Sequence, residues 1–374
     1  MQSQIPASEY NALVDLYNAT AGPSWRFQNG WLNPQAMGWY GVPITSGHVS
    51  ALNLDEINLK GSIPASLTNL SRLQHLNLEG NQLSGSIPAN LASLTLLQGI
   101  DLGNNQLSGG IPPSLGDLTN LVYLELDGNQ LSGSIPDTVG NIFWMQTLYL
   151  DDNQLSGSIP ASLSDLPVLT SLVLADNKLS GQIPDLSPAP IYVLDLSGNQ
   201  LSGSIPASLG KLSRLETLSL AFNHLGGIIP TNLGNIAQLE ELDLQGNQLS
   251  GDVPDFTTFT NTIFYTFTLN LYSNYLNIAA GSQSLSNIDA MSSNYIVVYL
   301  PQNASPTLGP ISFSGGAAQI AMTAEPGSYA IQTSSDLENW ITLTNLAVTN
   351  SSAAFLDSTV TNQPRRFYRT LNPP

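Results

Sequence analysis

Leucine alternates with polar residues in a short segment that recurs along most of the chain. In one copy, Leu76 and Leu78 are two positions apart, so their side chains leave the same face of an extended strand. His75, Asn77 and Glu79 alternate with these leucines and are expected on the solvent-facing side. The pattern therefore predicts a series of short strands, each buried on one face.

An asparagine-containing phrase follows each of these segments. N-Q-L-S-G-S-I-P, or a close variant, returns every 24 residues with one step of 22. A fixed period in this range is typical of stacked structural repeats, in which neighbouring units bury each other's apolar faces. Because a side-chain amide can satisfy turn backbone groups, we expect a structural ladder. Its members are Asn81, Asn105, Asn129, Asn153, Asn177, Asn199, Asn223 and Asn247.

The combined pattern L-x-x-L-x-L-x-x-N-x-L, followed by L-S-G-x-I-P, resembles the plant-type leucine-rich repeat of receptor-kinase ectodomains and polygalacturonase-inhibiting proteins. The resemblance implies an α/β solenoid of about ten repeats, a right-handed superhelix with a parallel sheet on its concave face. Short 3₁₀ or helical segments are expected on the convex side. One repeat is two residues short around Ser187–Pro190, so its convex segment is expected to be extended.

Residues 1–50 are expected to form an N-terminal helical cap, with Ser8 capping its helix. The segment around Gly38–Val42 resembles the plant-type cap motif C-x-W-x-G-V-x-C, with Met37 and Ile44 in place of the cysteines. Because the chain has no cysteine, we expect apolar packing to replace the disulfide. This departure favours a bacterial member of the family.

The other end of the chain loses the repeat. Residues 51–300 are expected to contain the repeats and a C-terminal cap, with a helix near 284–291 and a strand at 295–300. Residues 301–310 are interpreted as a proline-containing linker. In residues 311–374, short apolar runs separated by turn residues predict a small all-β sandwich, which resembles a fibronectin-like module of exported bacterial proteins.

Charge and composition exclude several classes of function. The chain has nine Lys and Arg residues against 27 Asp and Glu residues, a net charge of −18, which argues against nucleic-acid binding. No apolar run is long enough to predict membrane insertion.

No catalytic motif is present, and without cysteine there is no thiolate chemistry. The three histidines, His48, His75 and His224, are interpreted as isolated surface residues. We therefore expect a non-catalytic protein with no catalytic residue, metal or cofactor. A secreted or cell-surface location is expected, although no signal peptide opens this sequence.

Carboxylates gather at the outward positions of the predicted strands, where no basic residue occurs. A surface of one charge sign attracts an oppositely charged partner, and tyrosine is common at recognition surfaces. The predicted function is therefore recognition of a protein or peptide, cationic in character, by the concave face. A face kept acidic only for solubility and a glycosidase-type carboxylate pair are the alternatives. The predicted contact residues are Tyr123, Glu125, Asp127, Thr147, Tyr149 and Asp151.

A second polar series lies beside the asparagines. It suggests a structural or adhesion scaffold that binds polysaccharide, although recent duplication of the repeats explains the same regularity. Inhibition of an enzyme is implied by the family resemblance, and a hydrolase is the remaining alternative. The series comprises Gln82, Gln106, Gln130, Gln154, Gln200 and Gln248 with Ser84, Ser108, Ser132, Ser156 and Ser202.

Overall fold

The computed structural model describes residues 5–33, 38–256, 268–271, 273–276, Asn287, 296–298 and six strands between 307 and 371. The chain forms two compact units, Met1–Ser202 and Gly203–Pro374. This boundary lies inside the repeats, whereas the sequence pattern places a boundary near residue 300. The predicted boundaries at residues 50, 300 and 310 remain predictions.

Residues 1–202 contain two parallel sheets, the first of which is the parallel sheet that the family resemblance implies. Each repeat contributes one strand before its asparagine to the first sheet and one strand after it to the second sheet. The first sheet consists of β3 (Ala51–Asn53), β5 (His75–Asn77), β7 (Gly99–Asp101), β9 (Tyr123–Glu125), β11 (Thr147–Tyr149), β13 (Ser171–Val173) and β15 (Val193–Asp195). The second consists of β4 (Lys60–Gly61), β6 (Gln82–Gly85), β8 (Gln106–Gly109), β10 (Gln130–Gly133), β12 (Gln154–Gly157), β14 (Lys178–Gly181) and the start of β16 (Gln200–Ser204).

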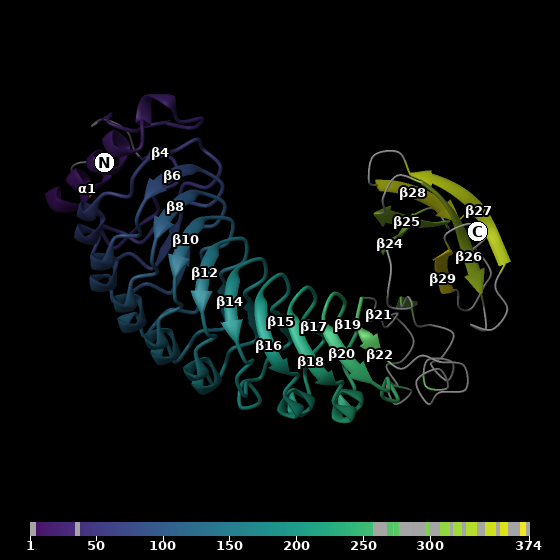
Figure 1. Ribbon diagram of the computed structural model, residues 1–374. Helices are drawn as coiled ribbons and strands as arrows, with labels where there is room; N and C mark the ends of the chain where they lie inside the picture. Colours follow the sequence, from purple (N-terminus) through teal and green to yellow (C-terminus); the bar gives the residue numbers. More distant parts are fainter. Residues whose placement is uncertain are drawn as a thin grey trace. The chain divides into compact units, whose positions relative to one another are not determined.

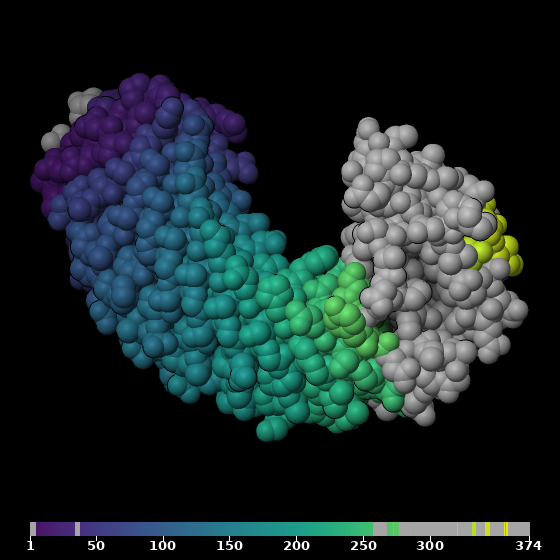
Figure 2. Space-filling model, viewed as in Figure 1, coloured from purple at the N-terminus to yellow at the C-terminus, as the bar shows by residue number. Residues whose placement is uncertain are grey.

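Short 3₁₀ helices complete the repeats of this unit. Each follows an Ile-Pro pair whose proline lies just before the helix, where a missing N–H costs no hydrogen bond. Figure 1 shows these helices along the outer edge of the stack, and Figure 2 shows the repeats packed closely in chain order. They are η2 (Ala65–Asn69), η3 (Ala89–Ser93), η4 (Pro113–Asp117), η5 (Asp137–Asn141) and η6 (Ala161–Asp165). The short repeat around Ser187–Pro190 has no helix, as predicted.

The core of each repeat is a layer of leucine and isoleucine. Leu76 and Leu78 from the first sheet and Leu83 from the second are 0% exposed, and Ile87 and Leu91 are nearly as buried. Gly85 has a φ of 81°, a left-handed conformation that residues with a Cβ resist, and this glycine ends the second strand. The layer has no polar side chain except the asparagine, so it stabilises the stack only when layers lie above and below it.

Asparagine side chains link one layer to the next. The Oδ1 atom of Asn129 accepts the backbone N–H of Leu107, 22 residues earlier, at 2.9 Å. Its Nδ2 lies 3.0 Å from the carbonyl oxygen of Leu102 and 3.1 Å from that of Leu126. The same bonds recur at Asn81, Asn105, Asn153, Asn177 and Asn199 within this unit. The buried amide therefore satisfies backbone groups of two successive repeats.

The N-terminal cap packs through aromatic rings. Helix α1 (Ala7–Ala19) begins after Pro6 without a side-chain cap, so the prediction that Ser8 caps it is wrong. Trp25, Trp31 and Trp39 are 3–7% exposed, and Trp31 contacts each of the other two at a ring-centroid distance of 4.7 Å. This cluster occupies the part of the cap where apolar packing is expected in place of a disulfide. Met37 lies outside the described residues, and Ile44 lies in β1 (Ile44–Thr45), which pairs with β2 (His48–Val49). A further turn, η1 (Gly22–Ser24), follows α1.

The second unit, residues 203–374, begins with repeats of the same architecture and continues into antiparallel strands. Its first sheet contains β17 (Thr217–Ser219), β19 (Glu241–Asp243), β21 (Thr268–Asn270) and β23 (Ile296–Val298), and its second contains β18 (His224–Ile228), β20 (Gln248–Gly251) and β22 (Tyr275–Leu276). Along the chain, the 3₁₀ helix η7 (Ala207–Lys211) precedes β17, and the 3₁₀ helix η8 (Thr231–Asn235) lies between β18 and β19. β23 lies within the predicted strand at 295–300, whereas the predicted helix at 284–291 lies outside the described residues apart from Asn287.

Six antiparallel strands follow, in the two small sheets that the sequence predicts. Ile320 of one sheet and Ile331 of the other are each 1% exposed, so apolar residues of both sheets are buried. β24 begins at Thr307 and therefore takes in the last four residues of the predicted linker. The sheets are β24 (Thr307–Ser314), β25 (Ala317–Thr323) and β28 (Ser352–Asp357), and β27 (Ile341–Val348), β26 (Gly327–Ser334) and β29 (Phe367–Leu371).

We predict that Asn129→Ala lowers the free energy of unfolding by about 2–4 kcal/mol, because it leaves the N–H of Leu107 and several buried carbonyls without partners. Urea unfolding followed by circular dichroism measures this change. Gln130→Ala, at the neighbouring exposed position, is the matched control and should change stability by less than about 0.5 kcal/mol. Equal effects from the two substitutions would contradict the structural role of the ladder.

Candidate functional site

Three rows of outward side chains cross the first sheet of residues 1–202. Register pairing places each residue beside its equivalent in the next repeat, and backbone hydrogen bonds continue this pairing just past the strands. Row one contains His75, Gly99, Tyr123, Thr147 and Ser171. Row two contains Asn77, Asp101, Glu125, Tyr149 and Val173, and row three contains Glu79, Gly103, Asp127, Asp151 and Ala175.

Rows two and three contain Glu79 and four further carboxylates on β7, β9 and the turns after β9 and β11, and we call these four the acidic patch: Asp101, Glu125, Asp127 and Asp151. Asp101 and Glu125 are register partners on β7 and β9. Asp127 leans over the glycine of the preceding repeat, because a Cβ on Gly103 would lie 2.8 Å from its Oδ1. The patch is therefore more compact than the strand spacing alone requires.

Hydrogen bonds hold two of these carboxylates. The backbone N–H of Gly103 donates to Oδ1 of Asp101 at 3.1 Å, and Asp101 is only 8% exposed. The Nδ2 of Asn104 donates to Oδ2 of Asp127 at 3.1 Å. These bonds fix the orientation of the carboxylates without neutralising their charge.

Burial raises the pKa of each carboxyl in the patch. The pKa of Glu125 rises to about 7, from burial first and then from the neighbouring Asp101 and Asp127. Burial likewise raises the pKa of Asp101 and that of Asp151 to about 6, and it raises the pKa of Asp127. Like charges that are partly removed from water disfavour ionisation, so the patch is electrostatically strained at neutral pH.

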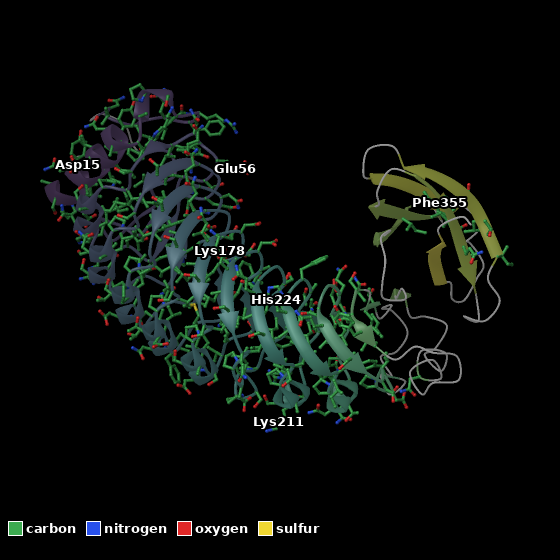
Figure 3. All side chains as sticks on the ribbon, in the orientation of Figure 1. Asp15, Glu56, Lys178, Lys211, His224 and Phe355 are labelled. Carbon is green, nitrogen blue, oxygen red and sulfur yellow. The ribbon has the colours of Figure 1, made fainter. Side chains whose placement is uncertain are left out.

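Among the described residues of 1–202, no basic side chain forms an ion pair with the acidic patch. Within the described part of residues 1–202, the one ion pair joins His48 to Glu9 in the cap, with Nδ1 and Oε1 at 2.6 Å. Lys60 and Lys178 lie on strands of the second sheet, and Figure 3 shows Lys178 on β14. An external cation would therefore meet carboxylates that have no basic partner in the described part of this unit.

Tyr123 lies across the sheet instead of standing away from it. A Cβ on Gly99 would lie only 1.9 Å from Cζ of Tyr123, so the tyrosine ring covers the glycine of the adjacent strand. Its hydroxyl lies 3.2 Å from Nδ1 of His75, one strand further, and the two rings are inclined by only 15°. We call Tyr123 and His75 the aromatic plate. The interpretation of His75 as an isolated surface residue is wrong, and so is that of His48, which pairs with Glu9.

The remaining predicted residues border this group. Thr147 is the register partner of Tyr123, and Tyr149 is the partner of Glu125. Ser171 donates a hydrogen bond to the hydroxyl of Tyr149 at 3.1 Å, so this tyrosine extends toward β13, away from the aromatic plate. The structure thus places all six predicted residues on one face. Three residues of this group were not predicted from the sequence: His75, Gly99 and Asp101. The available signal was Gly99, a glycine at a position where the next repeats carry a side chain.

The second sheet displays a different chemistry. Its outward positions on β6, β8, β10 and β12 carry Gln and Ser in register, with Ser84 beside Gln106 and Ser108 beside Gln130. Every one of these glutamines is exposed. We call the set Gln82, Gln106, Gln130, Gln154, Ser84, Ser108, Ser132 and Ser156 the Gln/Ser ladder; these strands carry no charged side chain, although Lys60 and Lys178 flank them.

Comparison with protein families identifies leucine-rich repeats in this chain. Residues 72–94, 96–118, 120–142 and 144–166 match the family described as "Leucine Rich Repeat", and residues 190–249 match "Leucine rich repeat". Together with the paired parallel sheets, these matches show that the matched segments are leucine-rich repeats and that the repeats form an α/β solenoid. A comparison with curated proteins finds no match.

Solved structures with this fold include plant receptors. The ectodomain of the receptor kinase GASSHO1/SCHENGEN3 from Arabidopsis thaliana, in complex with CASPARIAN STRIP INTEGRITY FACTOR 2, is 35% identical with a TM-score of 0.71 over 79% of this chain and 35% of its own. The plant peptide hormone receptor RGFR1, in complex with RGF2, is 36% identical with a TM-score of 0.62 over 68% of this chain and 40% of its own. This chain thus spans well under half of each receptor chain.

A third similar structure has another activity. It is a plant ice-binding protein, 26% identical with a TM-score of 0.54, and the similarity covers 74% of this chain and 97% of that one.

In the parts of this chain that the structure describes, no helix has the length and hydropathy needed to cross a bilayer. The same residues contain no cluster of three His, Asp or Glu side chains suited to a metal ion.

The raised pKa values predict how stability depends on pH. The folded chain retains protons on Asp101, Glu125 and Asp151 that the unfolded chain has lost above pH 4–5, so the free energy of unfolding should fall as pH rises through 6–7. Urea unfolding at pH 5 and pH 8 measures this, and Asp101→Asn with Glu125→Gln should reduce the difference. The control Asp117→Asn with Asp165→Asn, on exposed positions of η4 and η6, should keep it. The repulsion among these carboxylates would be contradicted if the wild-type protein were more stable at pH 8 than at pH 5 and Asp101→Asn/Glu125→Gln showed the same difference in free energy of unfolding.

Proposed function

We propose that this leucine-rich repeat protein is a non-catalytic recognition protein whose first sheet binds a cationic protein or peptide. The observation that carries the proposal is the acidic patch, four carboxylates on adjacent repeats with no basic partner within the described part of residues 1–202. Binding a cation would relieve the repulsion among Asp101, Glu125 and Asp127. The predicted secreted or cell-surface location belongs to this proposal.

The similar receptors support the class of partner. GASSHO1/SCHENGEN3 and RGFR1 have the same fold at 35% and 36% identity, and their structures contain a bound factor or hormone. Tyr123 and Tyr149 supply large rigid contact areas beside the patch, a composition common where proteins meet. Polygalacturonase inhibition and hydrolysis have no comparable support from a particular contact, so we do not propose them.

We predict that Asp127→Asn with Asp151→Asn lowers the affinity for a hexalysine peptide about tenfold, because two carboxylates that face the partner lose their charge. The wild-type affinity should fall as salt is raised, and the variant should show a weaker salt dependence. Isothermal titration calorimetry at two salt concentrations measures both quantities.

Two controls distinguish binding by the carboxylates of the first sheet from attraction by the net negative charge of the protein. Asp117→Asn with Asp165→Asn removes the same charge from the helical side and should change the affinity less than about twofold. A hexaglutamate peptide should not bind. If the two double variants lose the same affinity, the first sheet is not the binding surface.

A second candidate function is supported by the Gln/Ser ladder. Its uncharged and periodic surface repeats at the strand spacing of about 4.8 Å, which suits a periodic ligand. The similarity to a plant ice-binding protein favours ice as that ligand. Polysaccharide is the alternative that the sequence suggests for the same surface.

We predict that, if the ladder binds ice, Gln130→Lys abolishes most of the thermal hysteresis of the wild-type protein, because a strongly hydrated ammonium interrupts the surface. Lys178 occupies the equivalent position of a later repeat, so the fold accommodates this substitution. Asn141→Lys, which adds the same charge at the end of η5, is the control and should have no effect. Absence of hysteresis, with retention on insoluble cellulose that Gln130→Lys removes, would favour polysaccharide instead.

A further inference from the structure

The aromatic plate presents a flat π surface that the acidic patch borders. Tyr123 covers Gly99, and its hydroxyl contacts His75 while the two rings remain within 15° of parallel. The tyrosine ring therefore rests one face on the backbone of β7. The residue is partly exposed, so the opposite face is available to a ligand.

Two carboxylates, Glu125 and Asp101, occupy the row of the sheet next to that of this ring. Glu125 is two residues beyond Tyr123 on β9, so both side chains leave the same face at a separation of about 7 Å along the strand. Asp101 is likewise two residues beyond Gly99 on β7, and Gly99 is the residue under the ring. Asp101 is also the register partner of Glu125. Burial raises the pKa of the Tyr123 hydroxyl, and the charges of Glu125 and Asp101 raise it further.

We propose that this arrangement is an arginine-selective subsite, in which the guanidinium of a bound peptide lies on the Tyr123 ring and donates hydrogen bonds to Glu125 and Asp101. The planar guanidinium stacks on aromatic faces and presents several N–H groups in its own plane, where carboxylates beside the ring can accept them. A lysine ammonium carries the same charge but cannot stack and donate in one plane. The inference rests on the proposed function and specifies the side chain that the partner must supply.

Gly99 is the residue that makes the subsite. Tyr123 can lie flat only because Gly99 has no Cβ, and a methyl group there would collide with the ring at Cζ. Ala51, Thr147 and Ser171 occupy the same row, so the strand accepts a side chain at this position. Gly99→Ala should therefore fold normally while displacing the tyrosine ring.

The experiment compares hexa-arginine and hexalysine peptides, which carry equal charge, by isothermal titration calorimetry. Wild-type protein should bind hexa-arginine about tenfold more tightly. Gly99→Ala and Tyr123→Ala should reduce the ratio of the affinity for hexa-arginine to that for hexalysine to below about twofold, while the affinity for hexalysine is kept. Asp127→Asn with Asp151→Asn should weaken both peptides and leave the ratio near its wild-type value. Circular dichroism confirms that each variant is folded.

The outcomes separate the two proposals. A wild-type ratio below about twofold, or a ratio that survives Gly99→Ala and Tyr123→Ala, overturns the arginine subsite while leaving the acidic surface in place. Failure of both peptides to bind the wild-type protein overturns both proposals. Loss of the ratio in Phe143→Ala, which removes a more exposed aromatic ring after η5, would also overturn the inference, because that ring is outside the first sheet.

Discussion

The buried asparagine of each repeat is the interaction on which the rest of the structure depends. Its amide bonds to backbone groups of its own repeat and of the preceding one, as the contacts of Asn129 show. This fixes the translation between repeats as well as the conformation of the turn. Because the translation is fixed, residues 24 positions apart become neighbours, and a one-dimensional sequence period becomes rows on a surface.

The same strand alternation produces two chemically different surfaces. On the first sheet, outward positions collect carboxylates and tyrosines, whereas on the second they collect glutamine and serine. Neither surface contributes to the leucine core, so their composition is free to differ without cost to the fold. This independence explains why a scaffold of this kind can present one charged surface and one neutral surface to different partners.

Periodicity made the core and the turns predictable, because each depends on local spacing and recurs in every repeat, whereas the parallel sheet was implied by the family resemblance. The aromatic plate was not predictable in this way. It depends on the absence of a side chain at Gly99 and on a contact that spans 48 residues, from Tyr123 to His75. The role of Ser8 was mistaken because Pro6 already starts the helix. The strand that begins at Thr307 contains a proline and a register shift, so it lacks the alternation that identifies strands.

The N-terminal cap packs through tryptophan rings and, like the whole chain, contains no cysteine. Its folding should therefore proceed equally in oxidising and reducing surroundings. A chain without native thiols also accepts a single engineered cysteine at any exposed position without disulfide scrambling. Fluorophores could then be placed repeat by repeat along the stack, which would allow the opening of individual layers to be followed in solution.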